Sequence, residues 1–176
     1  LRERAIYYEY KNRKSYKQRL FRNILNYTRW TKGDKLSLTE CKDLFEFLEL
    51  EWVQTEERLY DLKEFGFSFT DHWYQVFKSD PEESLYVRQM LSNGEKLQDA
   101  PRVKLSTIHA AKGGEADNVL IILDNTRKIR EVVEKNQDKR DEEHRVWYVG
   151  VTRTKQNLYI MAAKKEDQGY DIESLG

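Results

Sequence analysis

Apolar residues recur at intervals of three and four positions through the first hundred residues of the chain. The positions with this spacing are Leu20, Ile24, Tyr27, Leu44, Phe47, Leu48 and Leu50. Such spacing gathers apolar side chains on one face of an α-helix, and Ser37 or Thr39 is suited to cap the second helix. The predicted breaks between helices are Gly33, Gly66, the Asp80-Pro81 pair and the Asn93-Gly94 pair. We therefore expect residues 1–100 to form a mostly α-helical lobe.

The pattern changes after Pro101. Val103–Ile108 alternates between apolar and polar positions, which predicts a strand, and Val119–Leu123 is apolar at every position. An uninterrupted apolar run of this length is typical of a strand buried on both faces of a parallel sheet. A helix over about 138–153 and a strand over 158–162 complete a strand, helix, strand order. We expect residues 101–176 to form an α/β domain on a parallel sheet.

The chain has 176 residues, enough for one domain that carries an inserted lobe. No segment approaches the roughly 20 apolar residues that span a bilayer, and no signal peptide precedes Leu1. Because Leu1 is not an initiating methionine, we expect the chain to start inside a longer protein. The single Cys41 excludes an internal disulfide and a cysteine-rich zinc site. The expected location is the cytoplasm.

The net charge of zero hides two segments of opposite charge. Residues 1–32 hold ten Lys and Arg against two acids, whereas residues 33–101 hold sixteen Asp and Glu against seven Lys and Arg. Aromatic residues lie among the bases of the first segment, namely Tyr7, Tyr8, Tyr10, Tyr16, Phe21, Tyr27 and Trp30. Such a segment is able to follow a phosphate backbone and stack on bases. The alternative is a solvated amphipathic helix whose aromatic side chains are core.

A group of chemically active residues follows the strand that begins at Val103. The group runs Ser106, Thr107, Ile108, His109, Ala110, Ala111, Lys112, Gly113, Gly114, Glu115. Loops at the carboxyl ends of strands in open α/β sheets face the ligand crevice, and paired glycines let a backbone approach a phosphate or sugar closely. Taken singly, His109 also fits a structural histidine, Lys112 a solvated charge and the glycines a simple turn.

A second group lies in the helix predicted near the end of the chain. It runs from Glu142 to Arg153, with acids first and an arginine last. This order matches the helix dipole. Arg153 is therefore explained by the helix alone as well as by a functional role.

Together, the two groups resemble motifs V and VI of UvrD-like superfamily 1 DNA helicases. The first motif has the form Thr, any, His, any, any, Lys, Gly, any, Glu, and the second is Tyr-Val-Gly-Val-Thr-Arg, matched by residues 107–115 and 148–153. The order, the spacing and the apolar strand after the first motif also agree. The chain departs from the family at Gly114, where Leu is usual, and at Ala116, where Phe is usual.

The resemblance implies a role for each matching residue. Arg153 would be a catalytic arginine finger at the γ-phosphate of ATP, and Glu115 would hydrogen-bond the ribose, with Gly113 also in the ATP site. Thr107 and His109 would lie at the backbone of single-stranded DNA, and Lys112 is placed with them. The resemblance implies no metal ligand in this chain.

For the fold, the resemblance implies a RecA-like, P-loop NTPase-like C-terminal motor domain with a parallel sheet. Residues 101–176 would be its 2A-like segment, and residues 1–100 would be the inserted, mostly helical 2B-like lobe. ATP and Mg²⁺ would be held mainly by an N-terminal motor domain of the same protein. The expected activity is ATP-driven translocation on single-stranded DNA and unwinding at duplex junctions, in the 3′ to 5′ direction.

The phosphate-binding loop of such an enzyme is missing from this sequence. That loop requires Gly-Lys-Ser or Gly-Lys-Thr, and none of the eight glycines is followed by lysine. The run Val119–Asp124 imitates a Walker B strand, but Asn125 follows where a helicase would have glutamate. We expect the isolated chain to show no DNA-stimulated ATPase activity.

Two alternatives from the sequence stay open. One is a non-catalytic DNA-binding or adaptor module that retains a degenerate helicase fold. The other is a nuclease-helicase, for which the sequence offers no cluster of Asp, Glu and Lys after the last predicted strand.

Overall fold

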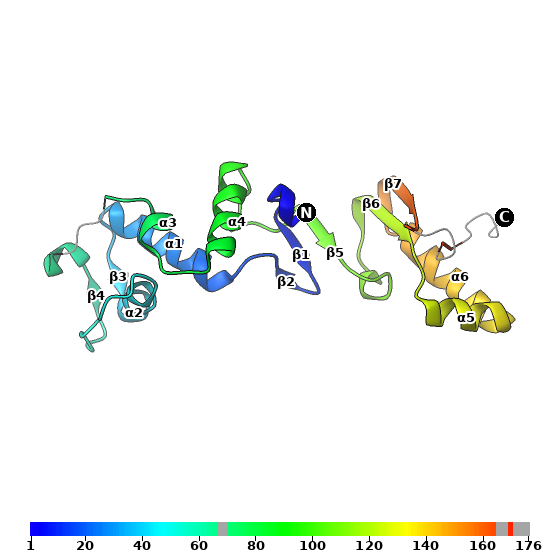
Figure 1. Ribbon diagram of the computed structural model, residues 1–176, viewed down its shortest axis with the longest axis horizontal. Helices are drawn as coiled ribbons and strands as arrows, with labels where there is room; N and C mark the ends of the chain where they lie inside the picture. Colours follow the sequence, from blue (N-terminus) through cyan, green and yellow to red (C-terminus); the bar gives the residue numbers. More distant parts are fainter. Residues whose placement is uncertain (67–69, 165–168, 171–176) are drawn as a thin grey trace. The chain divides into compact units, whose positions relative to one another are not determined.

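The computed structural model describes residues 1–66, 70–164 and 169–170. The chain divides into two compact units, Leu1–Leu105 and Ser106–Gly176, and each is described by itself (Figure 1). Both units combine helices with short strands, which confirms the mixed α/β content expected from the sequence. In the described ranges, no helix is both long and apolar enough to cross a membrane.

Helices and short strands alternate in the first unit. Its strands are β1 (Tyr8–Tyr10), β2 (Arg13–Lys14), β3 (Leu36–Ser37), β4 (Leu59–Tyr60) and β5 (Val103–Leu105). Its helices are α1 (Gln18–Thr31), α2 (Leu38–Phe47), α3 (Trp73–Val76) and α4 (Pro81–Ser92), with 3-10 helices η1 (Arg2–Arg4) and η2 (Leu62–Phe65).

Local chemistry explains where these helices begin and end. The hydroxyl of Ser37 accepts a hydrogen bond from the Glu40 amide at 3.3 Å, and the Glu40 carboxylate accepts one from the Ser37 amide at 2.8 Å. This reciprocal pair is a capping box, and it starts α2. Asp80 caps α4, and Pro81 occupies its first turn. α1 stops at Gly33, whose φ of 91° is strained for other residues.

The core of the first unit lies between α1, α2 and the segments that cover them. Trp30 of α1 stacks on Phe45 of α2 with ring centroids 6.2 Å apart, and Tyr27 meets Phe77 edge-on at 5.5 Å. The periodic apolar positions Leu20 and Ile24 are buried in the same cluster. Cys41 is completely buried there, and burial raises the pKa of its thiol to about 12. That thiol therefore stays protonated and serves as core.

Two small sheets complete the first unit. One has the order β2-β1-β5, in which β1 is antiparallel to β2 and parallel to β5. The other pairs β3 with β4. The strand expected over Val103–Ile108 ends at Leu105, because Ser106 and Thr107 lead into a 3-10 turn instead. It pairs with a strand of the first unit, so the expectation of one parallel sheet over residues 101–176 is met only by the strands that follow.

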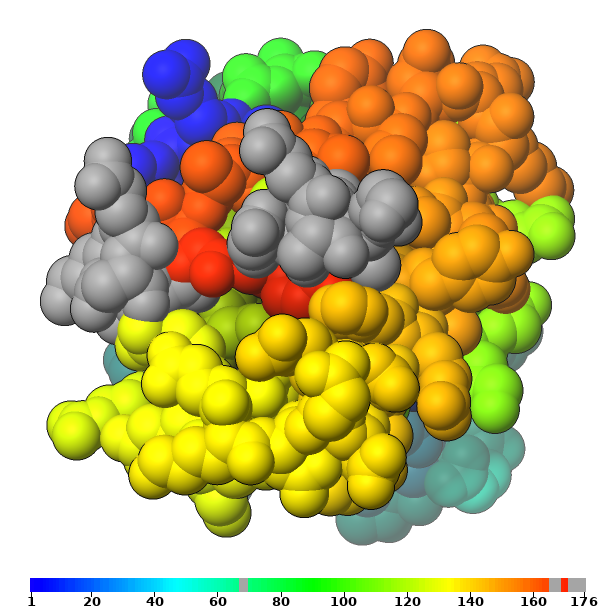
Figure 2. All heavy atoms as spheres, turned by 90° about the vertical axis from the view of Figure 1, so that its right-hand side faces the viewer, coloured from blue at the N-terminus to red at the C-terminus, as the bar shows by residue number. Residues whose placement is uncertain are grey.

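The second unit holds a parallel strand pair and a helix that covers one of its faces. Its elements are η3 (His109–Ala111), β6 (Ala116–Leu123), α5 (Arg127–Lys135), α6 (Gln137–Val151) and β7 (Thr154–Ala162). β6 pairs with β7 in parallel, with Ile121 opposite Ile160. Trp147 of α6 packs against Ile121 and Leu123 of β6. α5 and the first turns of α6 lie side by side on the face shown in Figure 2, in yellow and light orange.

One sequence prediction about β6 is wrong. The uninterrupted apolar run was expected to be buried on both faces, but only one face is covered within the described part of this unit. Ile121 and Leu123 face α6 and are buried, whereas Leu120 and Ile122 are 56% and 54% exposed. Their neighbours on β7, Tyr159 and Met161, are exposed as well. Because the side chains of a strand alternate between faces, a single covering helix buries only every second one.

Candidate functional site

The loop between β5 and β6 carries the first group of candidate residues. Thr107 begins it, and its hydroxyl accepts a hydrogen bond from the amide of Ala110 at 3.2 Å. The carbonyl of Thr107 accepts a second bond from the amide of Ala111 at 3.1 Å. Thr107 thus caps the single turn of η3 and fixes the direction in which that turn leaves the strand.

The two basic candidates of the loop point to solvent. His109 and Lys112 are exposed, and their side chains make no hydrogen bond or ion pair within the described residues. A solvated cation with no acidic partner is available to a phosphate. Neither side chain has a structural role that would explain its presence.

The paired glycines close the loop and turn it toward β6. Gly113 has a φ of 81°, in the left-handed region that only glycine enters without strain. The amide of Gly114 donates to the carbonyl of Ala111 at 3.0 Å. The carbonyl of Gly114 is thereby turned toward the end of α6, where Arg153 lies.

Arg153 joins the two candidate segments. Its Nη1 donates to the Gly114 carbonyl at 3.3 Å, its Nε to the Val149 carbonyl at 3.1 Å and its Nη2 to the Thr152 hydroxyl at 3.1 Å. The backbone adds a further link, because the Ala116 amide donates to the Arg153 carbonyl at 3.0 Å. Segments almost forty residues apart in sequence therefore meet at this arginine.

The electrostatic state of Arg153 is distinctive. Its three hydrogen bonds go to neutral oxygens, and it forms no ion pair with any acid in the part of the chain that the structure describes. A guanidinium has five N–H donors, so two remain for another acceptor. The side chain is half-buried, which strengthens its attraction for an anion relative to a fully solvated arginine. The arrangement holds a cation in place without neutralising it.

Glu115 has a partner that the sequence did not suggest. Its carboxylate lies 3.1 Å from the ammonium of Lys155, and both side chains are more than half exposed. The pairing of Ala116 with Thr154 across β6 and β7 places the two side chains side by side. An exposed pair of this kind contributes about 0–1 kcal/mol, so Glu115 remains able to exchange Lys155 for another donor.

Gly150 is a second residue whose role appears only in the structure. A Cβ at this position would lie 3.2 Å from Cδ1 of Ile108 and 3.3 Å from Cδ1 of Ile121. The absent side chain lets α6 approach β6 and the Thr107 loop closely. It thereby sets the position of Arg153, three residues further along. The only sequence signal was a glycine inside an otherwise helical segment.

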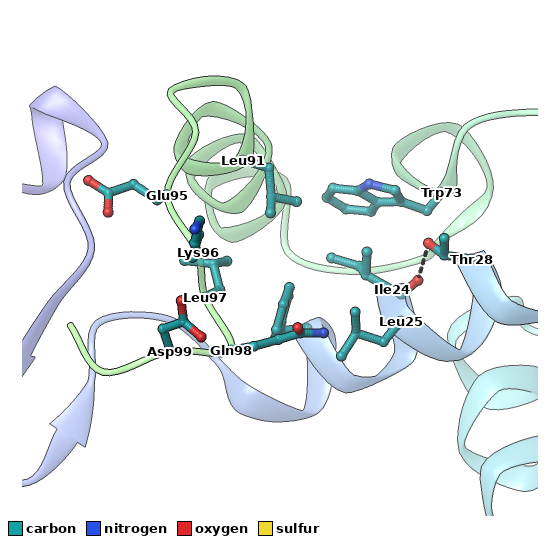
Figure 3. Close-up of a pocket in the computed structure, with 11 residues that line it drawn as sticks. Ile24, Leu25, Thr28, Trp73, Leu91, Glu95, Lys96, Leu97, Gln98 and Asp99 are labelled. Carbon is teal, nitrogen blue, oxygen red and sulfur yellow. Dashed lines mark hydrogen bonds between the residues drawn. The ribbon is translucent and has the colours of Figure 1, made fainter. Parts of the chain in front are cut away.

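The hollows found in the described residues do not coincide with these candidates. The larger one lies in the first unit, where Trp73 and Leu91 face Ile24 and Leu25 of α1 (Figure 3). No candidate residue lines it. The described ranges also contain no group of three or more His, Cys, Asp or Glu placed to hold a metal ion.

Comparisons with known proteins point to the same motifs. The ATP-dependent DNA helicase Rep of Buchnera aphidicola subsp. Schizaphis graminum is 33% identical over 80 residues, 44% of this chain and 12% of that protein. Rep of Escherichia coli is 32% identical over 82 residues, 47% of this chain and 12% of that protein. The probable DNA helicase II homolog of Rickettsia conorii is 38% identical over 76 residues, 40% and 11% respectively.

The matched part of the chain thus spans only about an eighth of the length of these relatives, 11 to 12%. No solved structure matches the chain. The family model of the UvrD-like helicase C-terminal domain, by contrast, matches residues 2–165. That match covers nearly the whole sequence, and the chain therefore belongs to the UvrD-like helicase C-terminal domain family.

Proposed function

We propose that the chain is the C-terminal part of an ATP-dependent DNA helicase that moves along single-stranded DNA and unwinds duplex junctions, in the 3′ to 5′ direction. The observation that carries the proposal is Arg153, a half-buried guanidinium held against the Gly114 carbonyl without an acidic partner. Family membership supports it, as do relatives named ATP-dependent DNA helicase Rep.

Arg153 acts in this proposal as an arginine finger on ATP. Three of its donors hold it to α6 and to the glycine loop, and the remaining two reach the γ-phosphate. A guanidinium suits this task because it stays charged and binds phosphate oxygens with two parallel donors. ATP and Mg²⁺ are held mainly by an N-terminal motor domain of the full protein, since no glycine here is followed by lysine. Closing the two domains then brings Arg153 to the phosphate, which stabilises charge in the transition state.

Glu115 and Gly113 complete the nucleotide side of the proposal. The carboxylate of Glu115 accepts hydrogen bonds from the ribose and leaves its weak pair with Lys155 to do so. Gly113 provides backbone without a side chain where the nucleotide approaches.

Thr107, His109 and Lys112 form the DNA side of the proposal. All three are exposed and lie within six residues of one another on the loop that ends at the nucleotide side. Lys112 and His109 contact phosphates, and the fixed turn at Thr107 aims them. Because one short loop carries both sets of contacts, movement of the nucleotide side is passed directly to the DNA side.

The two units correspond in this proposal to two parts of the motor. The second unit is a 2A-like segment of a RecA-like domain, and the first is the 2B-like accessory lobe. The exposed face of β6 and β7 supports this assignment, because parallel sheets are covered on both faces in complete α/β domains. Further parts of the full protein would cover Leu120 and Ile122 and extend the sheet.

The test is substitution of Arg153 in the full-length protein. Arg153→Ala is expected to lower kcat for DNA-stimulated ATP hydrolysis about 1000-fold or more. Arg153→Lys keeps the charge but loses the paired donors and should recover only part of the rate. The matched control is Arg145→Ala, which removes an exposed arginine from the same helix. If Arg153→Ala hydrolyses ATP as fast as the wild type, the finger role is rejected and the non-catalytic module becomes the better account.

A further inference from the structure

Ion pairs divide the cations of the basic N-terminal segment into two groups. Four arginines of this segment are paired with acids: Arg2 with Glu83, Arg19 with Asp43 and Glu46, Arg22 with Asp43, and Arg29 with Glu40, at N–O distances of 2.5 to 3.1 Å. Most of these acids come from α2, so the acidic middle of the chain neutralises α1. These arginines are not available to a nucleic acid.

The aromatic residues of the segment divide in the same way. Five of them are buried in the core of the first unit: Tyr7, Tyr16, Phe21, Tyr27 and Trp30. Tyr8 is half-buried. The ring of Tyr10, in contrast, is 49% exposed. Most of the basic and aromatic segment is therefore core, and the hairpin that contains Tyr10 is the exception.

The hairpin between β1 and β2 is built as a rigid projection. Its turn residues Lys11 and Asn12 have φ values of 50° and 60°, and two consecutive left-handed residues form the tight turn that matches the twist of a hairpin. Tyr10 pairs with Arg13 across the strands, so their side chains share one face. Lys14 lies on the opposite face, where its ammonium donates to the Leu97 carbonyl at 3.4 Å.

The exposed side of this hairpin combines one ring with two cations. Lys11 and Arg13 are exposed and form no ion pair within the described residues. The Lys11 ammonium lies 5.2 Å from the centroid of the Tyr10 ring. An exposed ring beside unpaired cations offers the two kinds of contact that single-stranded nucleic acids use, base stacking and phosphate neutralisation.

A second explanation for the cations must be weighed. β2 is the edge of the sheet β2-β1-β5, and exposed cations on an edge strand prevent pairing with other chains. That explanation accounts for Arg13 and Lys11. It does not account for Tyr10, because an exposed aromatic ring on the same face favours association rather than preventing it.

We propose that the tip of the β1–β2 hairpin, Tyr10, Lys11 and Arg13, is a contact site for single-stranded nucleic acid. Tyr10 stacks on a base, and Lys11 and Arg13 bind the phosphates beside it. The site is additional to the loop at Thr107, His109 and Lys112. It rests on the proposed function in one respect, since single-stranded DNA is the ligand of both.

The test measures the affinity of the full-length protein for a fluorescent oligothymidylate in the absence of ATP, over a range of salt concentrations. Tyr10→Ala should weaken binding about tenfold, as expected for one lost base stack, whereas Tyr10→Phe should bind like the wild type. Tyr10→Leu keeps apolar bulk and should bind as weakly as Tyr10→Ala. The double variant Lys11→Ala/Arg13→Ala should lower the slope of log K against log salt by about 1.4, which is about 0.7 for each phosphate contact.

The matched control removes two other exposed cations of the first unit, in Lys32→Ala/Lys35→Ala, and should leave the slope at the wild-type value. If the wild type binds and the hairpin variants bind equally well, the hairpin site is wrong while the proposed function stands. The same holds if the double variant binds normally but self-associates in sedimentation, because edge protection is then its role. If the wild type does not bind the oligonucleotide at all, both proposals fail.

Discussion

Gly150→Ala tests the packing that positions Arg153. The new Cβ would meet Ile108 at 3.2 and 3.4 Å and Ile121 at 3.3 Å, tighter than ordinary van der Waals contact. Overpacking of this kind costs about 1–3 kcal/mol. Alanine in place of glycine inside a helix recovers about 1 kcal/mol. Because Ile108 is half-buried and able to shift, we expect a net loss of about 1 kcal/mol, at the lower end of the overpacking range.

The assay is amide hydrogen exchange along β6 in the 176-residue chain, which reports the free energy of local opening of the second unit. Protection of the Ile121 and Leu123 amides should fall by about the factor that 1 kcal/mol represents, roughly fivefold. Gly150→Val adds bulk and loses the helix gain, and should cost more. If Gly150→Ala instead increases protection, helix propensity alone decides the outcome. The close approach of α6 to β6 is then wrong.

Three further predictions concern single residues. Gly113→Ala should destabilise the second unit by about 1–2 kcal/mol because its φ is 81°, whereas Gly114→Ala, with its nearest contact at 3.4 Å, should stay within about 0.5 kcal/mol in the same exchange experiment. Burial alone would raise the pKa of Glu40, but hydrogen bonds from Ser37 and from Arg29 outweigh it and hold the pKa below its ordinary value of 4.5. Its contribution is thus complete above the unfolded pKa and is lost as pH falls through the lower folded pKa. Glu40→Gln should therefore lower the thermal stability of the first unit at pH 7 and make that stability less sensitive to acid; equal acid sensitivity in both proteins would argue against the capping box. Leu120→Lys should leave the melting temperature of the chain nearly unchanged, since Leu120 is 56% exposed, while Ile121→Lys, at 6% exposure, should unfold β6; similar losses in the two variants would contradict the exposed face.

Local patterns were sufficient to predict most helices. The spacing of Leu20, Ile24 and Tyr27 predicted α1 because burial in a helix requires that period. Ser37 was one of two predicted caps, and the capping box with Glu40 shows that it is the one used. The helix predicted near residues 138–153 is α6, which ends at Val151.

Pairings between distant segments were beyond the reach of local patterns. β5 pairs with β1, more than ninety residues earlier in the chain, and no period in either strand encodes that partner. The apolar run of β6 indicated a buried strand, but alternation does not tell how many faces are covered when every position is apolar. The net charge likewise concealed the pairing of α1 arginines with acids of α2.

The candidate site was predicted in part. Thr107 to Glu115 and Arg153 were identified by motif, and their roles remain proposals. The contact between Arg153 and the Gly114 carbonyl, the pair of Glu115 with Lys155 and the close packing at Gly150 came from the structure. Each depends on the register between β6 and β7 or on the position of α6, which sequence spacing does not determine.

The central claim is that Arg153 serves hydrolysis while Thr107 and His109 serve DNA. The most direct measurement compares kcat for ATP hydrolysis at saturating DNA with the dissociation constant for single-stranded DNA, in full-length Arg153→Ala and Thr107→Val/His109→Ala proteins. The account predicts that the first variant loses hydrolysis and keeps DNA affinity, and that the second loses DNA affinity and keeps hydrolysis once DNA saturates it. Equal loss of both quantities in the Arg153 variant would contradict it.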